Sequence, residues 1–87
     1  MKDSILIINE KDNVAVALQD FEAGEKAAAG NMTPVTILEP VAAAHKIALR
    51  DIEAGEKIIK YGETVGKSTQ QIKKGAWVHT HNLEGGR

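Results

Sequence analysis

The sequence predicts a mainly β domain of short strands, and three observations support this fold class. Nine Ile and six Val stand against only three aromatic residues, so the core consists largely of β-branched side chains, which favour strands. A ten-residue segment recurs 31 residues further along the chain. Each copy contains a Gly where an extended run must turn. Together these features indicate several short strands connected by turns.

The repeat is the clearest local signal. Residues 17–26 read ALQDFEAGEK and residues 48–57 read ALRDIEAGEK, which are identical at eight of ten positions. In each copy an apolar run ends at an Asp that can accept hydrogen bonds from backbone N–H groups in the turn. A weaker third echo follows at residues 72–75. Because two or three copies are too few for a solenoid, we expect a compact fold with the copies related by a pseudo-twofold.

One segment has a composition that also suits a helix. Residues 41–61 are rich in Ala, Leu and Lys. However, the equivalent segment in the first copy, residues 14–18, has β-branched residues at alternate positions, and Gly55 would interrupt a long helix. We therefore predict strands near residues 5–9, 14–18, 35–38, 46–50, 57–61, 65–68 and 76–81. Residues 1–83 form a single domain, and residues 84–87 form a flexible tail or linker stub.

Length and composition exclude several classes of function. A chain of 87 residues buries only ~60% of the surface that its unfolded form exposes, so we expect self-association or a partner. The 11 basic and 12 acidic residues are interspersed, which argues against nucleic-acid binding. The absence of Cys excludes thiolate metal sites and Cys nucleophiles. The apolar run at residues 5–8 is too short to cross a membrane or to serve as a signal peptide, so we expect a cytoplasmic protein.

The candidate functional residues lie mainly near the C-terminus. If His79 and His81 lie on a strand, their spacing puts both imidazoles on one face, with Thr80 on the other. Two such imidazoles suit a divalent first-row metal, and His45 could be a third contributor. The alternative is that the pair decorates an exposed strand or a partner interface. Asn82 either donates to a substrate oxygen or makes a turn.

Lys60 and Tyr61 are adjacent in a predicted strand, so their side chains point to opposite faces. Lys60 is either a solvated charge or a contact to an anionic substrate. We expect Tyr61 to pack its ring in the core, and Trp77 to lie in the core or at an interface because it is the largest apolar side chain.

The same residues resemble a known family. Residues 45–52, HKIALRDI, followed by Gly55 and Glu56, resemble the core signature of SAF domains, which have the β-clip fold. Residues 59–68, IKYGETVGKS, and 72–83, IKKGAWVHTHNL, are similar to the N-terminal domain of altronate and galactarate dehydratases. The small subunit of sulfolactate sulfo-lyase shares this pattern. The resemblance covers roughly the whole chain and is strongest over residues 45–83.

One departure from the family pattern is Ala44, where members usually have Gly, so we expect a different approach to the strand that follows.

The resemblance implies a role as the small subunit of a sugar-acid dehydratase, a hydro-lyase that forms a 2-keto-3-deoxy acid together with a large catalytic subunit. It also implies a divalent metal, iron in this family, held mainly by that large subunit. The chain alone should be inactive. Two alternatives are the small subunit of sulfolactate sulfo-lyase and a non-catalytic SAF module that binds carbohydrate or assembly partners. The site residues implied are His79 and His81, as metal ligands or as contacts to a substrate carboxylate, with His45, Lys60 and Asn82 also facing the active site.

Overall fold

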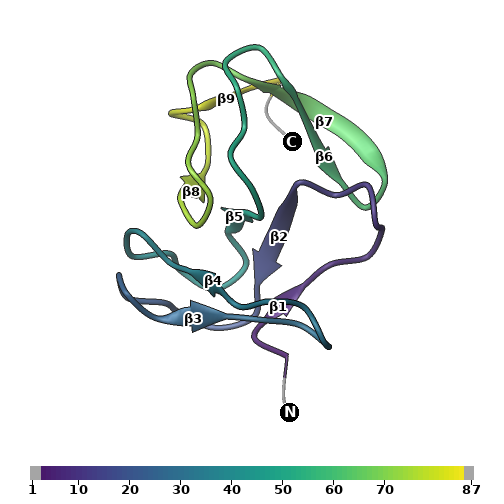
Figure 1. Ribbon diagram of the computed structural model, residues 1–87. Coiled ribbons are helices and arrows are strands. Elements are labelled where there is room, and N and C mark those ends of the chain that lie inside the picture. Colours follow the sequence, from purple (N-terminus) through teal and green to yellow (C-terminus); the bar gives the residue numbers. More distant parts are fainter. Residues whose placement is uncertain (1–2, 86–87) are drawn as a thin grey trace.

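The computed structural model describes residues 3–85 and shows an all-strand domain with no helix in that range (Figure 1). The prediction of a mainly β fold is therefore confirmed. Every strand pair is antiparallel. The strands are β1 (Ile5–Leu6), β2 (Val14–Ala17), β3 (Lys26–Ala27), β4 (Val35–Thr36), β5 (Lys46–Ala48), β6 (Lys57–Lys60), β7 (Glu63–Ser68), β8 (Trp77–Val78) and β9 (Leu83–Glu84).

The 31-residue repeat corresponds to two long antiparallel ribbons that share β5. In the first ribbon, residues 14 and 48, 21 and 41, and 27 and 35 lie opposite one another, all centred on position 31. In the second, residues 46 and 78, 52 and 72, and 58 and 66 are centred on position 62. The repeat seen in the sequence is thus the repeat of a hairpin: the pairs 15–47, 21–41 and 27–35 of the first ribbon recur 31 residues later as 46–78, 52–72 and 58–66.

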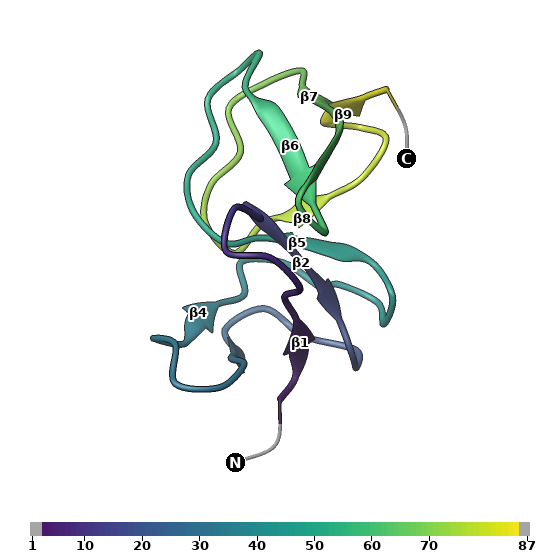
Figure 2. The same cartoon turned by 90° about the vertical axis from the view of Figure 1, so that its right-hand side faces the viewer.

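The sheet formed by β1, β2, β5 and β8 lies between two lobes (Figures 1 and 2). One lobe contains the β3–β4 ribbon end, and the other contains β6, β7 and β9. Since neighbouring residues of a strand point to opposite faces, the central sheet supports a core on each side. Ala15 and Ile47 belong to the first core and Val14 and Ala48 to the second. The two copies thus pack on opposite faces of the sheet.

Four equivalent turns hold the ribbons in shape. Each follows an apolar residue that forms an isolated bridge across the ribbon, and each has a residue with positive φ at the same place: Gly24 (+92°), Ala44 (+76°), Gly55 (+83°) and Gly75 (+90°). Asp20 accepts the backbone N–H of Ala43, and Asp51 accepts that of Lys74, both at 2.9 Å. The two Asp residues stabilise turns, as predicted. However, each Asp accepts its hydrogen bond from the turn on the opposite side of the ribbon and not from the turn that follows it in the sequence.

Two adjacent polar residues just before β2, Asp12 and Asn13, join the central sheet to the lobe that contains β6, β7 and β9. The buried Asn13 side chain donates to the Lys57 carbonyl at 2.8 Å and accepts the Ile59 N–H at 2.7 Å. The Asp12 carboxylate accepts the Gly62 N–H at 2.7 Å and also binds the turn at residues 8–9. Burial raises the pKa of Asp12, but these backbone donors outweigh it and leave the pKa below its usual value.

The structure corrects several details. The short strands β3 and β9 are additional, and β9 includes Glu84, which the sequence placed in the tail; residues 86–87 lie outside the described range. The strand predicted at 76–81 ends at Val78. The expectation that Tyr61 packs in the core is wrong, because its side chain is 42% exposed. Tyr61 and Gly62 form the two-residue loop between β6 and β7, with φ of +56° and +78°, which directs the ring outward.

Within residues 3–85 there is no helix of the length and apolar character needed to cross a membrane.

Candidate functional site

The three histidines of the chain gather around one indole, that of Trp77. Trp77 is the first residue of β8 and lies opposite Ile47 of β5, while His45 immediately precedes β5. The His79 ring stacks on the indole, with centroids 5.1 Å apart and planes 12° apart. The His45 and His81 rings lie tilted at 5.6 and 4.9 Å from it. These separations fall in the range of favourable ring contacts, so the indole holds all three imidazoles on one surface.

The convergence of His79 and His81 does not arise from a strand. The chain turns over residues 79–82, with the Asn82 N–H donating to the His79 carbonyl at 3.0 Å. The expected strand is therefore absent at these two residues. Each of the two rings contacts Trp77, and their placement on one face stays a prediction. The His79 ring also contacts the His45 ring, and the centroids of these two rings are 5.1 Å apart.

Asn82 is buried, at 3% exposure, and its side chain closes this turn. Its Oδ1 accepts the His79 N–H at 2.9 Å, and its Nδ2 donates to the Trp77 carbonyl at 2.9 Å. Of the two roles open from the sequence, the structure shows the turn. Contact with a substrate stays a prediction, and the present bonds make Asn82 a support for the histidines.

The Trp77 side chain and backbone are held from several sides. Glu39 accepts its backbone N–H at 3.1 Å, and its indole Nε1–H donates to His45 Nδ1 at 3.0 Å. The indole is half-buried and packs against the first core, beside residues such as Ile47. Sequence reasoning assigned Trp77 only to the core or an interface. Its position two residues before His79 was the one feature of the sequence that could have linked it to the histidines. The bond to His45 joins residues that are 32 positions apart and could not be read from local spacing.

Lys60 lies elsewhere. No hydrogen bond, ion pair or ring contact of residues 3–85 joins it to the histidines, and its ammonium lies 5.0 Å from the centroid of the Tyr61 ring. Its charge acts on Lys46 of β5: burial lowers the pKa of Lys46, and the nearby Lys60 lowers it further. Lys46 points to the opposite face of β5 from Ile47, and hence away from Trp77. Lys46 and Lys60 therefore bring two like charges near each other, apart from the histidines.

The capacity for metal binding is limited. Among residues 3–85, no three His, Asp or Glu side chains are grouped so that they could hold a metal ion. His79 and His81 remain the two candidate ligands, and a metal bound there needs further donors from outside residues 3–85.

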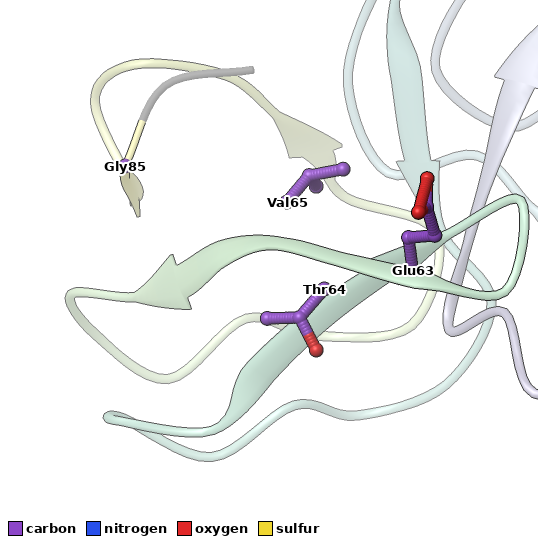
Figure 3. A pocket seen from close by; sticks show the side chains of 4 residues that line it. All are labelled: Glu63, Thr64, Val65 and Gly85. Atoms are coloured by element: carbon purple, nitrogen blue, oxygen red, sulfur yellow. The ribbon is translucent and has the colours of Figure 1, made fainter.

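A groove of about 450 Å³ lies elsewhere on the surface, lined by Glu63, Thr64 and Val65 of β7 and by Gly85 (Figure 3). Figure 3 shows the Glu63 and Val65 side chains on one side of β7 and Thr64 on the other. None of the predicted site residues lines this groove. The histidine cluster has the richer set of chemical groups, and we take it as the candidate site.

Comparison with known proteins gives matches over almost the whole chain. The family model described as the altronate/galactarate dehydratase SAF domain matches residues 3–86. The chain belongs to this SAF-domain family. It is 45% identical to altronate dehydratase of Escherichia coli (strain K12) over 75 residues, which is 86% of this chain and 15% of that protein. It is 35% identical to altronate dehydratase of Bacillus subtilis (strain 168) over 81 residues, 93% of this chain and 16% of that protein.

A third relative is itself named as a subunit. The SAF-domain chain is 45% identical to (2R)-sulfolactate sulfo-lyase subunit alpha of Paracoccus pantotrophus over 40 residues. That match covers 46% of this chain and 60% of the relative. The chain thus spans about one sixth of the length of the two altronate dehydratases, and most of each of those proteins has no counterpart here.

Proposed function

We propose that the chain is the small SAF part of a sugar-acid dehydratase of the altronate/galactarate type, acting with a large catalytic part. The reaction is a hydro-lyase step: a hydroxylated sugar acid loses water and becomes a 2-keto-3-deoxy acid. The match to the SAF domain of these enzymes over residues 3–86 is the observation that supports this most strongly. The altronate dehydratases that it resembles are about six times longer, which leaves ample protein for the catalytic groups.

The histidine cluster is the part of this domain that we place against the catalytic cleft. It offers imidazole groups on a half-buried aromatic surface, set by a turn whose backbone is fixed through Asn82. Loss of water requires a proton to leave the carbon beside a carboxylate, and positioned donors lower the energy of the charge that develops there. The lysine pair Lys46 and Lys60 is the second group in this domain suited to an anionic substrate.

A divalent metal, which we expect to be iron, would be bound mainly by the large part, with His79 and His81 as the ligands from this chain. Such an ion would stabilise negative charge on the substrate oxygens. The shortage of a third ligand among residues 3–85 supports a shared site over one contained within this domain.

The second candidate is the small subunit of a sulfolactate sulfo-lyase. It is favoured by the 45% identity to a relative that is itself named subunit alpha of such an enzyme. The shorter matched length, 40 residues against 75, is why we place it second.

The test is to co-express the chain with a dehydratase-like large protein, sought first among the genes beside its own, then to purify the complex and assay altronate, galactarate and sulfolactate. Turnover of a sugar acid supports the first candidate and turnover of sulfolactate the second. A complex that turns over none of the three, or a chain that binds no such protein, contradicts the proposal.

Variants of the same complex test the site. His79→Ala and His81→Ala should each lower kcat/KM by ~10²-fold or more, the scale of losing one positioned electrostatic or acid/base group. Thr80→Ala is the matched control, since Thr80 is exposed in the same turn and should leave activity near normal. Near-normal activity of both histidine variants, or loss of activity only because the complex dissociates, would show that the histidines are structural.

A further inference from the structure

Trp77 makes one contact that determines what a neighbouring histidine can do. An indole N–H is a donor only, so the 3.0 Å bond from Trp77 Nε1 requires a lone pair on His45 Nδ1. In a neutral imidazole the proton then sits on Nε2. The network therefore assigns one tautomer to His45.

The protonated nitrogen of His45 faces solvent. No hydrogen bond among residues 3–85 uses His45 Nε2, and no buried side-chain nitrogen or oxygen in that range lacks a partner. Because His45 is only half-buried, an unpaired Nε2 must be accessible. It presents an N–H group at the surface, beside the His79 ring.

This arrangement gives the three histidines different chemistry. A metal ion bound at His45 Nε2 would require the proton to move to Nδ1, which would place two N–H groups against each other at 3.0 Å. The ring nitrogens of His79 and His81 form no hydrogen bond with residues 3–85, so these two rings can present a lone pair. The sequence-based suggestion of His45 as a third metal ligand is therefore at odds with the bond.

We propose that Trp77 is a positioning residue that holds His45 as a fixed hydrogen-bond donor for an oxygen of an anionic hydroxy acid, most simply its carboxylate. The identity of the ligand rests on the proposed function, whereas the tautomer does not. Trp77 is suited to this task because its backbone is held at both the N–H and the carbonyl, by Glu39 and Asn82, and its ring packs on the core.

The tautomer is tested in the 87-residue chain by nuclear magnetic resonance with ¹⁵N labelling, at mildly alkaline pH. We expect a through-hydrogen-bond coupling between Trp77 Nε1 and His45 Nδ1, and a proton on His45 Nε2 alone. Trp77→Phe keeps an aromatic ring for packing and should abolish the coupling. A proton on His45 Nδ1 in the unmodified chain overturns the proposal, and that measurement needs no variant to fold.

Zn²⁺ provides a second arm of the experiment. Titrated into the labelled chain, it should shift the ring signals of His79 and His81 while the coupling from Trp77 to His45 persists. Loss of the coupling with Zn²⁺ bound at His45 Nε2 would overturn the assigned role.

The ligand is tested in the complex with the large part. His45→Ala removes the outward N–H, and Trp77→Phe leaves the imidazole unfixed. Both should raise KM for the hydroxy acid about tenfold or more with a smaller change in kcat, as expected for loss of a hydrogen bond to a charged group made in both ground and transition states. Unchanged KM in both variants contradicts the donor role. A complex with no activity at all refutes the proposed function, while the spectroscopic result stands by itself.

Discussion

Ala44 occupies the one turn of the four equivalent turns that lacks Gly, and its φ of +76° lies in the left-handed region. A non-Gly residue in that region costs roughly 1–2 kcal/mol. Replacing Ala44 by Gly removes this cost but gives the unfolded chain more freedom, worth about 0.4–1 kcal/mol. The net expectation is a gain of about 0.5–1 kcal/mol in the free energy of unfolding. The bond from the Ala44 N–H to the Ala17 carbonyl, 2.8 Å, involves only backbone atoms and is retained.

The assay is thermal unfolding followed by circular dichroism, with urea unfolding to obtain the free energy. For a domain of this size, a gain of 1 kcal/mol raises Tm by about 4–8 °C, so Ala44→Gly should raise it by roughly 2–8 °C.

Two Gly substitutions serve as matched controls. Gly55→Ala reverses the change in the equivalent turn, where φ is +83° and an added Cβ meets nothing within 4 Å. It should destabilise by about the amount that Ala44→Gly stabilises. Gly75→Ala should cost more, because an added Cβ there would overlap the Thr36 carbonyl oxygen. A decrease in Tm for Ala44→Gly, or equal effects of the two Gly→Ala changes, would refute the reasoning from backbone strain.

The remaining predictions concern Asp12, Asn13 and the behaviour of the isolated chain. The lowered pKa of Asp12 means that its ionised form stabilises the fold above about pH 4, the range of an unfolded Asp, and that this stability is lost as pH falls through the folded pKa. The stability difference between the wild-type chain and Asp12→Asn, measured by urea unfolding, should therefore shrink on acidification; a constant difference would contradict the assignment. Asn13→Ala removes the buried side chain that bonds to the Lys57 carbonyl and the Ile59 N–H and should cost about 2–3 kcal/mol, whereas Asn31→Ala, at an exposed position, should cost less than about 0.5 kcal/mol. The purified chain alone should show no turnover of any sugar acid, and measurable turnover would show that the catalytic groups lie within it. We also expect the isolated chain to self-associate, which a concentration-dependent sedimentation experiment would reveal, since Ile8 and Leu18 are 60% and 50% exposed.

The sequence by itself determined the fold class, the repeat and the family. β-branched side chains and the Gly-containing turns are local properties, and they survive in the structure because each turn needs a positive φ whatever surrounds it. The two histidines near the C-terminus were also visible as a pattern, but the strand that was expected to place both rings on one face ends at Val78.

Only the tertiary structure decided which side chains support the histidines and which histidine is held in one tautomer. The bond from Trp77 to His45 and the effect of the Lys60 charge on Lys46 each connect separate segments of the chain. No local spacing could therefore predict them. Tyr61 faces solvent because a two-residue loop fixes its backbone, which overrides the preference of an aromatic ring for burial. Residues far apart in sequence acquire their chemistry from the partner that the ribbon register places opposite them, and that register is a property of the whole fold.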